Sequence, residues 1–209
     1  MGDPVANGLL PRLVRPGGNI TGFALFEPSM GGKWLELLSE IAPALKRATI
    51  ITRPDTDPVS PYMRSVETAA QSLKIVPIIA PVHSDVEIET AIIAIGREPG
   101  GGLAVMPEVF TLGLRASIIS AAARNNVPAV YAASEVVREG GLLSYGVDRV
   151  DIFRRAASYV DRVLRGAKPG ELPFQLPTKF EMVVNRKTAT ALGLAIPPSI
   201  MLRADEVIE

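Results

Sequence analysis

A repeated alternation of short β-branched runs with amphipathic segments, from about residue 20 to residue 132, restricts the fold most strongly. Between the runs, apolar residues recur at helical spacing, as at Trp34, Leu37 and Leu38. A run that is apolar on both faces, such as residues 48–52, is typical of the interior of a parallel sheet. Strands are predicted over residues 20–26, 48–52, 75–82, 103–106 and 127–131. The pattern predicts an α/β fold with a doubly wound, mostly parallel sheet and right-handed crossovers.

Local signals place the starts of several helices. Ser60 and Pro61 form the pattern of an N-cap followed by a proline at the first helical position. Ser84 and Glu87 have the spacing of a capping box, in which each side chain accepts a hydrogen bond from an N–H group of the first turn. Other helices are predicted over about 30–45 and 111–124.

After Gly141 the rhythm changes. A strand is predicted over residues 142–146, followed by a helix over 149–165 with Asp148 as its N-cap and Gly166 as its terminator. One face of this helix is apolar and comprises Ile152, Phe153, Ala156, Tyr159, Val160 and Val163. The remaining chain is predicted to contain an extended stretch over 168–177, a strand over 180–184 and short helices near 186–192 and 202–208.

Charge and composition argue against several classes of function. The 22 basic and 22 acidic residues balance, and no basic stripe favours nucleic acid as a partner. The sequence has no cysteine, which excludes thiolate nucleophiles and cysteine-ligated metals. His83 is the only histidine and lies in a polar loop, so a histidine-based metal cluster cannot form. We therefore expect no metal and no cofactor.

Catalytic patterns are also missing from the sequence. The acidic pairs, such as Asp55 with Asp57, have no accompanying base, nucleophile or oxyanion-stabilising group. The glycine-rich segments over residues 15–19 and 100–102 lack the arrangement that cradles phosphates, and they indicate turns instead. The sequence thus favours a binding protein over an enzyme.

The predicted fold indicates where a ligand would bind. In open parallel sheets, ligands bind beyond the carboxyl ends of the strands, where loops and helix N-termini present polar groups. Each residue there can equally serve in a turn or a cap. The candidate ligand-binding residues at this edge are Ser29, Met30, Thr52, Arg53, Pro107, Glu108, Ser134 and Glu135.

Three segments carry a family resemblance. They are GGLLSYGVD at residues 140–148, RPGGNITG at 15–22 and a tail that contains PTKFE at 177–181 and GLAIPPS at 193–199. Together with RADEVI at 203–208, they match in order along essentially the whole chain. The sequence resembles the ABC-transporter substrate-binding family with the type I periplasmic-binding fold.

This resemblance implies a function and a division into lobes. The implied function is capture of a small solute, such as an amino acid or related organic acid, in a cleft between two lobes, and its delivery to the membrane permease of an ABC importer. Residues 19–141 and 171–209 would form the second lobe, with residues 1–18 and 142–170 as hinge and remnants of the first. The implied location is periplasmic or otherwise extracytoplasmic. Because relatives carry more of the first lobe, weak solute binding by this chain alone is expected.

The resemblance also implies individual roles. Tyr145 and Asp148 of the Ser-Tyr-Gly-x-Asp motif are candidates for the cleft, where the carboxylate could pair with a ligand amine and the ring could stack. They could equally be a hinge-packing ring and a helix N-cap. Relatives often have Asn-Pro where this chain has Arg53-Pro54, which places a cation at the cleft edge.

The sequence also allows other interpretations. The same fold serves as the effector-binding domain of transcription regulators, although no helix-turn-helix pattern is present here. A flavodoxin-like enzyme would need a phosphate loop after the first strand, and residues 27–29 fit that role poorly. Without a first lobe to cover it, the apolar face of the helix over 149–165 should either fold back on its own lobe or pack against a second chain, and the second outcome predicts a homodimer built on this helix.

Overall fold

The computed structural model describes residues 4–5, 8–53 and 61–209 of the chain. It contains two compact units, the first formed by Met1–Glu27 with Val147–Phe180 and the second by Pro28–Gly146 with Glu181–Glu209. The division into lobes that the resemblance implies, residues 19–141 with 171–209 and residues 1–18 with 142–170, stays a prediction.

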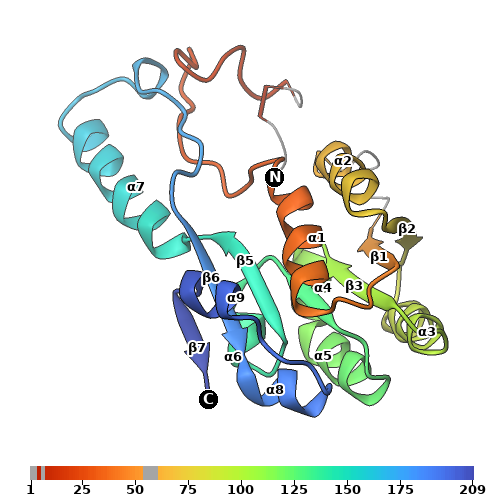
Figure 1. The fold of residues 1–209 in the computed structure, drawn as a ribbon. Coiled ribbons are helices and arrows are strands. Elements are labelled where there is room, and N and C mark those ends of the chain that lie inside the picture. The colour runs from red at the N-terminus through yellow and green to blue at the C-terminus, as the bar shows by residue number, and fades with distance from the viewer. Residues whose placement is uncertain (1–3, 6–7, 54–60) are drawn as a thin grey trace. The chain divides into compact units, whose positions relative to one another are not determined.

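In the described residues, a seven-stranded sheet has the order β2-β1-β3-β4-β5-β6-β7 (Figure 1). The strands are β1 Arg47–Thr52, β2 Val76–Pro81, β3 Gly101–Val105, β4 Ala129–Tyr131, β5 Leu143–Val147, β6 Phe180–Asn185 and β7 Glu206–Ile208. The strands β1 to β5 pair in parallel, and β7 is parallel to β6. β6 is antiparallel to β5. Two hydrogen bonds show this direction: Asn185 N–H donates to Leu142 O at one end, and Asp148 N–H donates to Lys179 O at the other. The predicted mostly parallel α/β sheet is therefore confirmed.

Helices cover both faces of this sheet. Those of the second unit are α1 Met30–Ile41, α2 Met63–Leu73, α3 Asp85–Gly96, α4 Val109–Gly113, α5 Arg115–Arg124, α6 Ser134–Arg138, α8 Arg186–Ala191 and α9 Pro198–Arg203. Leu103 packs in one core cluster with residues of α3, α5 and α6. Its neighbour Gly102 faces the opposite way along the strand, toward Leu38 of α1. The alternation thus buries α1 on one face and α3, α5 and α6 on the other, as a doubly wound sheet requires.

The predicted helix start at Ser84 is confirmed. Ser84 is the N-cap of α3, and its Oγ accepts from Glu87 N–H at 3.3 Å. The Glu87 carboxylate reaches back to His83 N–H at 2.9 Å, one residue earlier than a capping box requires. Ser60 lies outside the described residues, and α2 begins at Met63, so Pro61 does not occupy the first helical position.

Two predicted elements are wrong. Residues 20–26 do not open the sheet, since only Phe23 forms an isolated bridge, with Gln175 of the first unit. The short run pairs with the returning chain instead: Ala24 N–H donates to Gln175 O and Gln175 N–H donates to Gly22 O. The predicted helix over 202–208 ends at Arg203, and Glu206–Ile208 forms β7 because β6 offers its backbone edge to this β-branched segment.

The first unit is built around α7 Arg149–Leu164, which is followed by a short 3₁₀ turn at Pro169–Glu171. The Tyr159 ring contacts Phe23 with ring centroids 4.8 Å apart, and its hydroxyl donates to Pro173 O at 2.8 Å. Gly166 has a positive φ of 98°, which suits a residue that follows a helix end. Of the predicted apolar face, Ile152 and Tyr159 are buried, whereas Phe153 and Val160 are exposed.

Candidate ligand-binding edge

The carboxyl ends of β1, β3, β4 and β5 lie along one edge of the sheet, because these strands are parallel. β6 runs the other way, so its first residues lie at this same edge. We call this the ligand edge. The opposite edge contains a surface hollow of about 280 Å³ lined by residues of α8 and α9, among them Arg186, Thr190 and Met201.

Thr52, Arg53 and Glu108 form a hydrogen-bonded cluster at the ligand edge. Thr52 Oγ1 donates to Glu108 Oε1 at 3.2 Å. The backbone N–H of Arg53 donates to both carboxylate oxygens of Glu108, at 3.3 and 3.1 Å. Glu108 occupies the N-cap position of α4, directly after β3. Its carboxylate therefore joins the end of β1 to the turn that follows β3.

The Arg53 side chain adds a positive charge to this cluster. Its guanidinium carbon lies 4.7 Å from the centroid of the Phe110 ring on α4. This distance is within the range of a favourable cation–π contact, and Arg53 and Phe110 are both half-buried. The neighbouring Pro107 is exposed. Opposite charges on Arg53 and Glu108 thus stand at the ends of adjacent strands.

Ser134 belongs to a second polar group at the edge. This buried serine begins α6, and its Oγ donates to Glu181 Oε1 at 2.5 Å and accepts from Arg138 Nη1 at 3.1 Å. Arg138 also pairs with Glu206 at 2.6 Å, and that hydrogen bond raises the pKa of the guanidinium. Glu135, next along α6, is half-buried.

Glu181 is the residue of this group that the strand pattern missed. A residue at the start of a strand lies at the ligand edge only when that strand is antiparallel to the others. The direction of β6 is set by the chain that returns from α7, which the local sequence does not reveal.

Ser29 and Met30 lie where the sheet edge meets α1. Ser29 is the N-cap residue and Met30 is buried, 3% exposed. The first turn is held from α2: Ser65 Oγ donates to Pro28 O at 2.5 Å and accepts from Gly32 N–H at 3.2 Å. These contacts fix the start of α1 against α2.

Tyr145 and Asp148 fall in different units. The carbonyl of Tyr145 accepts from the Trp34 indole N–H at 2.7 Å, and burial is the main cause that raises the pKa of its phenol. Asp148 Oδ1 accepts from Asp151 N–H at 2.9 Å, so it is the N-cap of α7. Its Oδ2 pairs with Lys179 Nζ at 2.8 Å, and this hydrogen bond is the main cause that lowers the Asp148 pKa.

The predicted site residues therefore have different hydrogen-bond partners in the structure. Thr52, Arg53 and Glu108 come together, whereas Ser134 bonds to Glu181. Asp148 caps a helix in the other unit, as its alternative interpretation required. The described part of the chain holds no group of three acidic, histidine or cysteine side chains that could bind a metal, and no helix in that part is long and apolar enough to span a membrane.

Comparisons with known proteins agree with the fold. The family model for ABC transporter substrate binding proteins matches residues 1–208. A conserved domain protein of Vibrio cholerae superposes with a TM-score of 0.86 at 28% identity, over 98% of this chain and 68% of that chain. An ABC domain of Streptococcus pneumoniae, solved in complex with L-Trp, gives a TM-score of 0.86 at 25% identity, over 99% of this chain and 70% of that one.

A curated relative is the tyrosine-binding protein of Clostridioides difficile. It is 23% identical over 192 residues, which are 92% of this chain and 55% of that protein. The chain thus spans about half the length of the curated relative. The matching family is one of solute-binding proteins rather than enzymes. From the family match and the parallel sheet together, the chain belongs to the ABC transporter substrate-binding proteins, with the type I periplasmic-binding fold.

Proposed function

We propose that this chain is the solute-binding component of an ABC importer, acts outside the cytoplasmic membrane and binds a free amino acid or related organic acid at the ligand edge. The observation that carries this proposal is the cluster of Thr52, Arg53 and Glu108 at the carboxyl ends of two adjacent strands. Open parallel sheets bind their ligands at this edge. One relative is named a tyrosine-binding protein and another was solved in complex with L-Trp, which supports an amino acid as the ligand class.

The other candidate residues would complete the lining of this site. Ser29, Met30 and Pro107 would border it from α1 and the turn after β3, while Ser134 and Glu135 would border it from α6. Tyr145 would supply an aromatic surface from β5. Asp148, in the first unit, stays a candidate from the family resemblance, and its two oxygens bind Asp151 N–H and Lys179.

The direct test is a titration of the chain with a panel of amino acids. Two-dimensional NMR monitors the titration, because it detects affinities as weak as the millimolar range. L-Tyrosine, L-tryptophan and glycine form the first set, with glucose and ribose as controls. We expect saturable shifts with at least one amino acid and none with the sugars. Saturation by the sugars alone would refute an amino-acid ligand.

Transport requires a permease partner, which we infer from the family. The test is co-purification of the chain with a permease encoded beside its gene, and uptake of labelled amino acid in cells that carry or lack the chain. Uptake that does not change when the chain is removed would refute the importer role.

We also infer that the chain forms a homodimer through α7. Exposed apolar residues recur along one stripe of this helix, and four of them are 58–81% exposed: Val150, Phe153, Val160 and Leu164. With exposed Ala157 between them, the stripe is nearly symmetric about its centre. In an antiparallel pair that crosses at Ala157, Val150 would face Leu164 of a second copy and Phe153 would face its Val160.

Charge favours the same pairing. Arg154 and Asp161 flank the stripe and are both exposed, three residues before and four residues after Ala157. The two-fold pairing would place Arg154 of each copy beside Asp161 of the other. The exposed apolar stripe and the two flanking charges thus support a second copy of this chain as the partner of α7.

A further inference from the structure

The ligand edge carries two opposite charges whose positions are fixed by their neighbours. Arg53 directly follows β1 and Glu108 follows β3, and these two strands are paired with Ile51 opposite Val105. The Glu108 carboxylate is held by Thr52 Oγ1 and by the backbone N–H of Arg53. The Arg53 guanidinium is held over the Phe110 ring. Neither charge therefore needs much reorganisation to meet a ligand, which favours binding.

The chemistry of the two groups is complementary to one kind of small molecule. A guanidinium is planar, offers several N–H donors and fits a carboxylate with two parallel hydrogen bonds. A carboxylate accepts several hydrogen bonds, so Glu108 can receive an ammonium group in addition to the donors that hold it. A free α-amino acid carries a carboxylate and an ammonium on the same carbon atom. Its charged end presents the opposite of each charge at the edge.

We propose that Arg53 and Glu108 together bind the charged end of a free α-amino acid, with Arg53 on its carboxylate and Glu108 on its ammonium. This assignment rests on the proposed function and adds to it the groups that select the ligand class. Both side chains are half-buried, which strengthens charge–charge attraction relative to open water. The assignment of Arg53 and Glu108 predicts that ligands lacking either the carboxylate or the ammonium bind poorly, whatever their side chain.

The test combines three ligands with two variants of the full chain. L-Tryptophan has both charges, L-tryptophanamide lacks the carboxylate, and N-acetyl-L-tryptophan lacks the ammonium. We expect Arg53→Gln to weaken L-tryptophan binding by about tenfold or more and to leave the amide unchanged. Glu108→Gln should weaken L-tryptophan similarly and leave the N-acetyl compound unchanged. A variant that weakens all three ligands equally would show a structural role and overturn the assignment.

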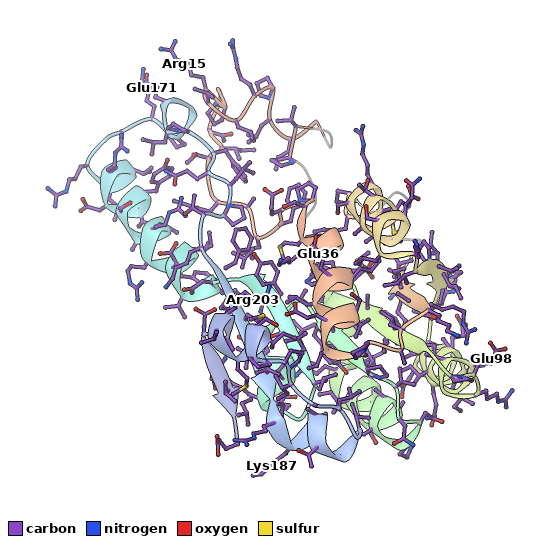
Figure 2. The ribbon with its side chains drawn as sticks, in the orientation of Figure 1. Arg15, Glu36, Glu98, Glu171, Lys187 and Arg203 are labelled. Atoms are coloured by element: carbon purple, nitrogen blue, oxygen red, sulfur yellow. The ribbon has the colours of Figure 1, made fainter. Side chains whose placement is uncertain are left out.

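Matched controls come from the opposite edge of the sheet. Arg97→Gln and Glu98→Gln make the same charge changes at exposed positions after α3, and Glu98, labelled in Figure 2, pairs with Arg47 at the start of β1. These controls should bind L-tryptophan as the unsubstituted chain does. If the controls and the test variants lost the same affinity for L-tryptophan, the change in net charge alone would explain the loss, and the assignment would be overturned.

A further experiment separates this inference from the proposed function. Glycine consists of little more than the charged end, and the Arg53 Nε–H signal reports on its binding in NMR. A glycine-dependent shift of this signal that Glu108→Gln abolishes would support the assignment even if no larger amino acid bound. Tight binding of L-tryptophan that neither variant affects would support the function and refute the assignment. The absence of any Arg53 response to glycine or L-tryptophan would also refute it.

Discussion

Asp148 divides its two carboxylate oxygens between a helix N-terminus and a lysine. Oδ1 accepts from Asp151 N–H, one of the groups that the first turn of α7 leaves without an intrahelical partner. Oδ2 pairs with Lys179, which precedes β6. One side chain thus fixes both the start of α7 and its connection to the chain that returns to the sheet.

Removing this cap should destabilise the chain. We expect Asp148→Ala to lower the free energy of unfolding by about 1 kcal/mol, the usual cost of a lost N-cap. Urea denaturation followed by circular dichroism measures the change. Glu171→Ala is the matched control in the same unit, since it removes only an exposed ion pair with Lys168. Equal losses in the two variants would contradict the capping role.

The charge of Asp148 should contribute stability that depends on pH. Its pKa is lowered in the folded state, mainly by Lys179, so the contribution is present above the unfolded-state pKa and is lost as pH falls through the folded-state pKa. Asp148→Asn keeps a capping oxygen and removes the charge. The stability difference between this variant and the unsubstituted chain should be present at neutral pH and shrink in acid. A difference that grows in acid would contradict this account.

Local signals predicted such residues well. Asp148 and Ser84 are caps because of residues within one helical turn, so the sequence alone identifies them. Arg53 and Glu108 were each predicted at the ligand edge, but their contact depends on β1 and β3 being neighbours in the sheet. Glu181 depends further on the reversed direction of β6. The candidate site was thus predictable as a set of strand ends, and its internal contacts were not.

At the scale of elements, α1 and α2 pack closely because of a glycine. A Cβ atom on Gly31 would lie 2.6 Å from Tyr62 O and 2.8 Å from Ser65 Oγ. The α1 helix is also tied to α9, where Arg203 Nη2 donates to Glu40 Oε2 at 2.5 Å. Because of the contacts with Tyr62 and Ser65, position 31 has no room for a side chain unless α2 moves.

Gly31→Ala should destabilise the second unit even though alanine favours helices. We expect a loss of about 1–3 kcal/mol, typical of overpacking, because the nearest obstacle is backbone rather than a flexible side chain. Gly113→Ala is the control, as a Cβ there meets nothing within 4 Å. Thermal denaturation of both variants measures the difference. A Gly31→Ala chain as stable as the unsubstituted one would contradict the close approach.

Elements were predicted correctly where periodicity and tertiary pairing agreed. The strands β1 to β5 and the helix α7 were predicted from the local hydrophobic pattern. Burial of a strand on both faces, or of a helix on one face, imposes such a pattern on the sequence. The strand predicted over residues 20–26 and the helix predicted over 202–208 are wrong, because the segments that pair with them decide their structure. Gln175 pairs with the first segment and β6 pairs with the second. A short apolar run does not by itself reveal its partner.

At the scale of the whole molecule, α7 determines the predicted oligomeric state. Burial of each large apolar side chain stabilises an assembly by roughly 1.5–3 kcal/mol, so the stripe around Ala157 favours pairing. Light scattering should give twice the mass of one chain. Phe153→Glu combined with Val160→Glu should produce monomers, whereas Ser158→Glu, exposed elsewhere on α7, should not. A monodisperse, unsubstituted monomer would refute the homodimer.

We propose that an amino acid binds at the ligand edge of the second unit. This binding is tested by mapping the backbone NMR shifts that saturating L-tryptophan causes. We expect the largest shifts at Thr52, Arg53, Glu108 and Phe110, with smaller ones at Ser134. Shifts centred instead on the hollow of α8 and α9, around Thr190 and Met201 at the opposite edge, would contradict it.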